Sequence, residues 1–536
     1  MTKKFWFIGG GVLLLGIIGF IIYSMMTPKD LARHIPNDAV MAVRVDMASM
    51  AQKMPLDQMK DLSFFQFIKK DMPAKAREQF EKIMKDPKAS GINFLQSPYF
   101  FLTPGSIDFE DMTMGVVVGI SDKASFLETF KAMTKGELSS KEEGGFTVFS
   151  DDDMAKLLVS DEVAFFLYKN PNSRASLLET AKSMLDLSKD KSLAGNDGFS
   201  TFLKNAGDIS MYMNKSAYKK MFNQSPQAML FLGGGLFNDM IDAYPVGYSI
   251  SFEEDRILGK TIPDPAASKS ASYFKETGLS EKDLTWLDPN GTPLMYMTAN
   301  VQVKNIITEG MKNSFLKAGI EEELMPLGLT QQDLESFLAG NISIALNDIQ
   351  YTPVFSEFDG TELYMKDKPL FTIHATMDNT KAYDKILAMG GTNLVNEGGL
   401  IGLELNPYNN DSVFLYVKGK ELFISNVSSN LSSLRDGISW KPLQKQYLPE
   451  LAQKNPMAMF VSLNTTAFEK YMKGSGNEQE KVAIRAVVSN LKQLTAHVSG
   501  DKAEVELTMT EKKQNSLWRM MLMVDDAFKA ARMNAF

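Results

Sequence analysis

The chain has 536 residues, with 57 Lys and Arg residues against 65 Asp and Glu residues, so its formal net charge is −8. It contains no cysteine and only three histidines, which excludes disulfides, thiolate metal sites, iron–sulfur clusters, cysteine nucleophiles and lipid attachment through cysteine. Hydrophobic residues make up 44% and charged residues 23%, as in ordinary globular proteins, and the mild acidity gives no electrostatic reason to expect nucleic acid.

Residues 1–28 are predicted to form a short cytoplasmic stub and a transmembrane anchor. Lys3 and Lys4 precede an uncharged run from Phe5 to Tyr23, and about 20 apolar residues span the hydrocarbon core of a bilayer. The alternative is a cleaved signal peptide, but its apolar region is about 7–15 residues long and ends in a small-x-small site, which is missing here. Because lysines favour the cytoplasmic side, we expect a single-pass inner-membrane protein with a cytoplasmic N-terminus and a periplasmic bulk.

Residues 29–262 are predicted to form a first α+β module. Short runs rich in β-branched and aromatic residues predict strands, and apolar residues at helical spacing predict a helix at 124–133. Adjacent strand pairs with separate helices indicate a mainly antiparallel sheet with helices on one face. The predicted strands are 40–45, 114–120, 146–149, 163–168, 209–213 and 248–252.

Residues 263–286 are predicted to link this module to a second α+β module at 287–512. The linker begins with a run rich in proline, alanine and serine at 263–270. A helix is expected at 381–389, and Gly419 and Gly500 mark hairpin turns. The predicted strands are 294–299, 342–346, 370–376, 412–417, 422–425, 457–463 and 503–509.

The two modules resemble each other in sequence, which predicts an internal duplication. Five pairs of blocks match in the same order, and the offset between matched positions drifts only slowly. A repeat of this length indicates a duplicated domain rather than a solenoid. The paired blocks are 36–46 with 289–300, 122–133 with 378–389, 143–145 with 397–399, 214–218 with 464–468, and 255–256 with 501–502.

Residues 513–536 are predicted to form a C-terminal amphipathic helix. Its apolar residues recur at helical spacing, and charged residues lie mostly on the other face. Such a helix most often packs on its own domain, and the alternative is a role in binding a partner or a membrane surface. The apolar residues are Leu517, Met520, Met521, Val524, Phe528 and Ala531.

Six polar residues recur in both modules, and each follows a predicted strand and opens a helical pattern. Asp and Asn are favoured there because the side-chain oxygen accepts a hydrogen bond from an amide of the first helical turn. We therefore predict that they are helix caps and not a catalytic or metal site. The pairs are Asp46 with Asn300, Asp122 with Asp378, and Asn214 with Asn464.

The sequence predicts no catalytic, cofactor-binding or metal-binding residue. His34, His374 and His497 are not at the spacing of a zinc signature, and the last two lie in predicted strands, where a lone histidine is usually structural. Signatures of nucleophilic serine hydrolases, phosphate loops, dinucleotide-binding loops and calcium loops are also missing. The 35 methionines are expected to fill the core.

Several segments resemble an uncharacterised family of Bacteroidota cell-envelope proteins, known as a domain of unknown function. The first is Ile35-Pro36-Asn37-Asp38-Ala39, followed by Gly91-Ile92-Asn93-Phe94, by Pro98-Tyr99-Phe100-Phe101 and by 338–346. The resemblance covers about residues 30–512 and implies an envelope location and a duplicated α+β fold, with no activity or site residue. Many members resemble lipoproteins, whereas this chain has no cysteine and carries the predicted anchor instead. Asp411-Ser412-Val413 also resembles an O-glycosylation motif of that phylum.

Three functions remain open from the sequence. We expect a non-enzymatic protein that binds or scaffolds a partner in the cell envelope, since two similar modules can form a cleft at their interface. The first alternative is a carrier of lipids or other hydrophobic ligands, with walls rich in Met and Phe. The second is a hydrolase of envelope polymers that uses paired carboxylates.

Overall fold

The computed structural model describes residues 30–533 except for 105–111, 135–137, 151, 172, 224–240, 243–244, 265–272, 312–316, 320–321, 323–327, 356–360, 382, 386–393, 398–399, 407–410 and 473–477. The anchor predicted at Phe5–Tyr23 lies outside these residues. Among the helices that are described, none combines the length and apolar character needed to cross a membrane.

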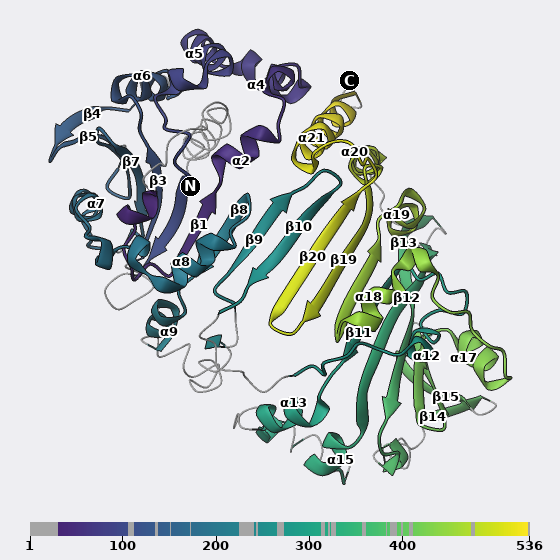
Figure 1. Ribbon diagram of the computed structural model, residues 1–536. Helices are drawn as coiled ribbons and strands as arrows, with labels where there is room; N and C mark the ends of the chain where they lie inside the picture. Colours follow the sequence, from purple (N-terminus) through teal and green to yellow (C-terminus); the bar gives the residue numbers. More distant parts are fainter. Residues whose placement is uncertain are drawn as a thin grey trace. The chain divides into compact units, whose positions relative to one another are not determined.

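The chain forms two compact units (Figure 1). Unit 1 comprises Met1–Ala267 and Lys512–Arg532, and unit 2 comprises Ser268–Glu511 and Met533–Phe536. Helices and strands are present in both, and the described strand pairs within each unit are antiparallel. The predicted α+β class with antiparallel pairing is therefore confirmed.

The described strands of unit 1 form one sheet in the order β4-β5-β6-β7-β3-β2-β1-β8-β9-β10. The strands are β1 (Met41–Val45), β2 (Tyr99–Thr103), β3 (Thr113–Gly119), β4 (Ser140–Glu143), β5 (Phe146–Ser150), β6 (Ala155–Val159), β7 (Val163–Lys169), β8 (Ile209–Met213), β9 (Gly247–Phe252) and β10 (Arg256–Ile262). The helices are η1 (Leu31–His34), α2 (Met47–Gln52), α3 (Leu56–Met59), α4 (Ser63–Asp71), α5 (Ala74–Lys85), η2 (Pro87–Ser90), α6 (Lys123–Met133), α7 (Leu177–Leu185), η4 (Lys189–Lys191), η5 (Leu193–Gly195), α8 (Asp197–Lys204), α9 (Lys215–Asn223) and α21 (Ser516–Met533).

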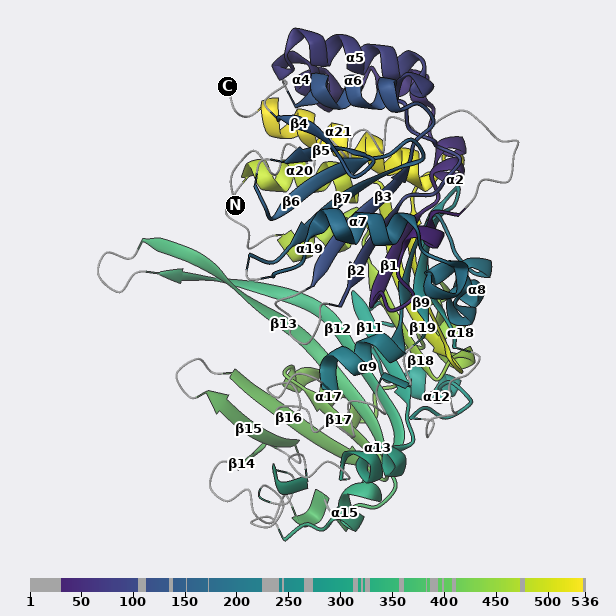
Figure 2. The ribbon, with the colours of Figure 1, turned by 90° about the vertical axis from the view of Figure 1, so that its left-hand side faces the viewer.

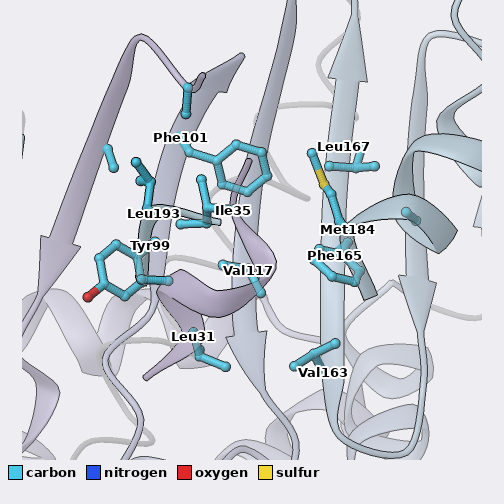
Figure 3. Close-up of a cluster of buried hydrophobic side chains, with 14 of the residues drawn as sticks. Leu31, Ile35, Tyr99, Phe101, Val117, Val163, Phe165, Leu167, Met184 and Leu193 are labelled. Atoms are coloured by element: carbon cyan, nitrogen blue, oxygen red, sulfur yellow. The ribbon is translucent and has the colours of Figure 1, made fainter. Parts of the chain in front are cut away.

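Helices pack on both faces of the unit 1 sheet, so the expectation of helices on one face is wrong for this unit. Neighbouring residues of β7 point to opposite faces: Phe165 joins one apolar core with η1, α7 and α8, whereas Ala164 joins a second core with α2, α4, α5 and α6. Figure 3 shows the first core, with Val117 and Phe165 among its labelled side chains. Both faces of these strands are apolar, so neither could be left to solvent without exposing large side chains.

The C-terminal helix α21 belongs to unit 1, although it follows the last strand of unit 2 in sequence. Leu517 and Trp518 lie in the second core of unit 1, and the ring of Phe528 lies 5.4 Å from that of Phe67 in α4. The helix start is fixed by hydrogen bonds from the backbone amide of Ser516 to the carbonyl of Glu253 (2.8 Å). The amphipathic pattern thus reflects packing on the module at the other end of the sequence.

The described strands of unit 2 form a sheet in the order β14-β15-β16-β17-β13-β12-β11-β18-β19-β20. The strands are β11 (Met295–Asn300), β12 (Leu338–Phe355), β13 (Glu362–Met377), β14 (Leu394–Glu397), β15 (Leu400–Asn406), β16 (Asp411–Lys418), β17 (Glu421–Ser425), β18 (Met457–Ser462), β19 (Leu491–Ser499) and β20 (Lys502–Met509). The helices are α12 (Glu281–Leu284), α13 (Val303–Gly310), α15 (Gln331–Glu335), α17 (Ser428–Arg435), η7 (Lys445–Tyr447), α18 (Pro449–Lys454), α19 (Thr465–Met472) and α20 (Glu478–Val488).

The two sheets have the same strand order, because each strand of unit 2 occupies the place of the unit 1 strand numbered ten lower. The main difference is the long hairpin of β12 and β13, whose register runs from Leu338 opposite Met377 to Phe355 opposite Glu362. Figure 2 shows this hairpin as a ribbon that extends past the neighbouring strands of unit 2. Every strand predicted from sequence coincides with an observed strand, and β19 was recognised only around His497. Six further strands were missed, namely β2, β4, β6, β10, β14 and β15.

Candidate functional site

Four of the six recurring polar residues are helix caps, as predicted. In unit 1, Asp46 accepts a hydrogen bond from the amide of Ser49 (2.9 Å), and Asp122 accepts one from the amide of Ser125 (2.6 Å). The two remaining caps are Asn214, which accepts from the amide of Ala217 at 3.2 Å, and Asn464, which accepts from the amide of Ala467 at 2.9 Å. These residues are therefore occupied by their own helices and form no site.

The capping prediction is wrong for Asn300 and Asp378. Asn300 ends β11 and donates from its amide nitrogen to the carbonyl of Thr277 (2.9 Å), so it ties the preceding loop to the sheet. Asp378 is displaced by its neighbour Asn379, whose side chain accepts from the amide of Lys381 (3.0 Å). Adjacent Asp and Asn residues compete for the same cap, and the sequence alone did not decide between them.

Four carboxylates are buried among the described residues, and each is held by donors of its own unit. Asp208, for example, is 2% exposed and accepts bonds of 2.6 Å from Lys53, from the hydroxyl of Ser49 and from the amide of Phe252. Asp283 and Asp288 are held similarly by nearby amides and side chains, and Asp525 by the amide of Phe64 in α4. Nor do His, Asp and Glu side chains gather in groups of three fit for a metal ion within the described part of the chain.

The three histidines have different surroundings. His34 is buried in unit 1, where its Nδ1 lies 3.3 Å from the carbonyl of Met184 and its Nε2 accepts from Arg33 at 2.9 Å. Burial, reinforced by the charge of Arg33, lowers the pKa of His34. His497 is half-buried in β19. The contacts of His34 with Arg33 and Met184 indicate a structural role for this histidine.

His374 lies at the centre of a buried polar cluster in unit 2. It is 1% exposed in β13, and its Nε2 lies 2.9 Å from the carboxylate of Glu421 in β17. The same carboxylate accepts from Lys282 (3.0 Å) and from the hydroxyl of Thr376 (3.1 Å). The hydrogen bond from His374 holds the pKa of Glu421 down to about 2, with Lys282 acting in the same direction and burial opposing both.

The turn after α12 covers this cluster with an indole ring. Ser280 and Asp283 form a capping box that starts α12, and Leu284 and Leu287 are buried beneath it. The indole ring of Trp286 between them lies 6.2 Å from the ring of His374, centroid to centroid. The position of Trp286 is thus set by a local helix signal and by its two apolar neighbours.

Three polar atoms of this region have no hydrogen-bond partner within the described part of the chain. They are Nδ1 of His374, the indole nitrogen of Trp286 and the hydroxyl of Ser343. Ser343 is 1% exposed and lies directly opposite His374 in the register of β12 and β13, so the two side chains share one face of the sheet. Buried polar atoms are nearly always hydrogen-bonded, which makes this group unusual.

A second feature of unit 2 is an apolar, half-buried face of its sheet. In β11 the buried residues Tyr296 and Thr298 alternate with half-buried Met295 and Met297, which point to the opposite face. Their register partners continue the apolar surface across six strands. One row consists of Ile373, Ile344, Met297, Met459, Ala496 and Val505, and the next of Phe371, Leu346, Met295, Val461, Leu494 and Leu507.

In unit 1, the sheet face that carries the second core continues as a similar apolar surface, because Val43 and Val116 lie two residues from Val45 and Val118 of that core. Met211 of β8 lies opposite Val43 of β1, which lies opposite Phe100 of β2, and that in turn opposite Val116 of β3. Phe100 is 40% exposed, as is Met114 beside it. We call these two surfaces the methionine faces, defined by Val43, Phe100, Met114, Val116 and Met211 in unit 1 and by the two rows given above in unit 2. Methionine adapts its shape to different ligands, so such faces suit apolar partners.

Among solved structures, the chain is similar to crystal form I of TP0453, with 9% identity, a TM-score of 0.21, and coverage of 77% of this chain and 98% of that one. Crystal form III of TP0453 gives 8% identity, a TM-score of 0.19, and coverage of 76% and 98%. TM-scores this low carry no argument about fold or function. A search of curated proteins found no match.

A protein-family model matches the chain over a range that includes both units. The model is described as a domain of unknown function (DUF4836), and it spans residues 32–517. This range starts in η1 and ends in α21, so it includes both sheets. The protein therefore belongs to the family described as domain of unknown function DUF4836.

Proposed function

We propose that this protein is a membrane-anchored, non-enzymatic component of the Bacteroidota cell envelope that binds a partner in the periplasm. The placement rests on the predicted anchor at Phe5–Tyr23 and on the resemblance around Ile35-Pro36-Asn37-Asp38-Ala39. The single observation that carries the binding role is the pair of methionine faces. Apolar side chains that stay accessible on a sheet face, such as Phe100 and Met114 at 40% exposure and Val505 at 44%, are typical of interaction sites.

We also propose that the two units arose by internal duplication. The identical strand order of the two sheets and the five matched sequence blocks support this. A duplicated module gives one chain two similar apolar surfaces, which suits a scaffold with two contact points or a partner with a repeated element.

The experiment is affinity purification of the native full-length protein from membranes in a mild detergent, with and without crosslinking. We expect a defined partner to co-purify, and we expect Met297→Glu with Met459→Glu to abolish its recovery, because two charges would lie at the centre of the unit 2 face. Ile438→Glu is the matched control, since Ile438 is 61% exposed and lies outside both faces. Recovery of only a bare monomer under all conditions would contradict the proposal.

A carrier of lipids or other hydrophobic ligands is the second candidate, and the same faces favour it. Their side chains are apolar across six strands in unit 2, which is the chemistry that an acyl chain requires. Native mass spectrometry of the purified protein separates the two candidates: a bound lipid that is lost in the Met297→Glu, Met459→Glu variant supports the carrier, and a protein partner supports the scaffold.

The buried carboxylates do not support the hypothesis that the protein is a hydrolase of envelope polymers. Asp208, Asp283, Asp288 and Asp525 accept hydrogen bonds from caps, amides or lysines of their own units, which leaves none of these four aimed at a substrate. Two facing carboxylates about 5–10 Å apart in an accessible cleft would be needed to restore it.

A further inference from the structure

The polar cluster of unit 2 occupies a place that is apolar in unit 1. His374 lies between Ser343 and Phe423 in the register of β12, β13 and β17. The unit 1 strands in the same places put Val117 between Tyr99 and Phe165. Val117 is fully buried in the apolar core shown in Figure 3.

Glu421 has an apolar counterpart as well. The carbonyl of Lys420, one residue before it, accepts the amide of Met377, and in unit 1 the carbonyl of Glu162 accepts the amide of Ile120 in the same way. The residue after Glu162 is Val163, which is also fully buried. The histidine and glutamate of unit 2 thus take the places of two valines.

The comparison with unit 1 shows that this strand arrangement can form without the polar pair of His374 and Glu421. Burying a charged or strongly polar pair carries a desolvation cost, and apolar residues of similar volume are often equally or more stabilising. Unit 1 builds the same strand order with Val117 and Val163, so this sheet position does not require a polar pair. The pair in unit 2 therefore needs an explanation other than stability.

The donors and acceptors of the cluster specify what it binds. The ionised carboxylate of Glu421 can only accept, so Nε2 of His374 donates to it, and in the neutral imidazole Nδ1 is then an acceptor. The indole nitrogen of Trp286 is a donor only, and the hydroxyl of Ser343 can do either. The group that complements an acceptor beside a donor is one that both donates and accepts, and a hydroxyl is the smallest such group.

We propose that the cluster of His374, Ser343 and Trp286 is a binding site for a hydroxyl group, which donates to Nδ1 of His374 and accepts from the indole N–H of Trp286. The hydroxyl belongs either to a buried water molecule or to an alcohol or sugar group of a ligand. Glu421 and Lys282 act through His374, because they hold the tautomer that makes Nδ1 an acceptor. Unit 1 lacks the site.

The test uses the full-length protein in detergent, labelled with ¹⁵N. Three histidines and four tryptophans give few ring signals, and His374→Val and Trp286→Phe identify those of the cluster. We expect Nε2 of His374 to carry the proton at neutral pH, Nδ1 to be an unprotonated acceptor, and the indole proton of Trp286 to show a cross-peak either to a long-lived water or to a ligand. Native mass spectrometry distinguishes these two sources, because only a ligand adds mass.

A double variant, His374→Val with Glu421→Val, supplies the unit 1 pair and serves as the matched control. It should keep or raise the melting temperature and lose the cross-peak or the added mass, whereas Glu421→Val alone should lower the melting temperature by leaving His374 without its partner. If the double variant does not fold, Trp286→Phe alone still removes the indole donor. A protonated Nδ1, or an indole proton with neither a water nor a ligand cross-peak, would overturn the proposal.

Discussion

The carboxylate of Asp525 in α21 accepts a hydrogen bond from the backbone amide of Phe64 in α4, with an N–Oδ1 distance of 3.0 Å. Helix α4 begins after Leu62, which has no side-chain oxygen, so the residue next to the helix provides no cap. A residue 461 positions away in sequence takes over this role. The second carboxylate oxygen of Asp525 lies 2.7 Å from Lys529, one turn further along α21.

Replacing Asp525 with alanine should destabilise unit 1 by about 1–2 kcal/mol, because α4 loses its cap and the half-buried amide of Phe64 loses its acceptor. The measurement is hydrogen exchange with mass spectrometry across a urea series, which reports each unit separately. Protection of α4 should fall, while that of β11 and β18 stays unchanged. Asp526→Ala is the control, since its side chain is 54% exposed, and an equal loss of protection in both variants would refute the capping role.

Gly91 should be far less tolerant of substitution than Gly145, although both have positive φ angles of 74° and 84°. A Cβ atom on Gly91 would lie 2.3 Å from the carbonyl oxygen of Asp122 and 2.4 Å from the amide of Phe126, whereas one on Gly145 would meet nothing within 4 Å. We expect Gly145→Ala to cost about 1 kcal/mol of backbone strain and Gly91→Ala about 3 kcal/mol. Urea unfolding of the two variants checks this, and equal losses would show that the close approach is unimportant.

Unit 2 should lose stability as the pH falls from about 4.5 to about 2, because the pKa of Glu421 drops from 4.5 to about 2 on folding. The unfolded state then binds a proton that the folded state does not, so the contribution of this carboxylate is full above pH 4.5 and disappears near pH 2. Glu421→Gln should flatten the pH dependence of unit 2 in this window. Hydrogen exchange of β13 and β17 measured across this pH range would reveal an unchanged slope if the assignment were wrong.

Unit 1 should show a separate pH dependence below about 6.5, where His34 titrates in the unfolded chain. Burial lowers the pKa of His34 in the folded state, so its contribution is full above 6.5 and is lost as the pH falls towards the folded value. His34→Gln should remove this dependence while it keeps a neutral polar side chain beside Arg33. Thermal melts at pH 7.5 and pH 5.5 should then differ less in the variant than in the wild type.

Most of the described strands, and fewer of the helices, were readable from local sequence. Runs such as Met114–Gly119 and Met457–Ser462 alternate in burial, and that alternation is a property of a strand itself. Strands β4 and β10 were missed because Ser140–Glu143 is fully polar and Arg256–Ile262 mixes charges with a glycine. Pairing with neighbours, not composition, makes these segments strands.

The helix caps show which interactions local sequence patterns can predict and which they cannot. Asp122 and Asn464 follow a strand and precede a helix, and their side chains reach amides three residues ahead, so the sequence contains the whole interaction. The cap of α4 could not be found in this way, because Leu62 gives no signal and Asp525 lies in another helix. Interactions across the chain depend on the path of the backbone, which local patterns do not contain.

By itself, the sequence determined the α+β class, the antiparallel strands, the four helix starts at Asp46, Asp122, Asn214 and Asn464, and the resemblance to an uncharacterised family. Only the tertiary structure decided that α21 completes unit 1 and that His374, Glu421, Ser343 and Trp286 meet in one buried cluster. The physical reason is the sequence separation between the interacting residues. Alternation, capping and turn formation act over a few residues. A buried cluster instead forms from strands and turns that are distant in sequence and become adjacent only when the sheet assembles.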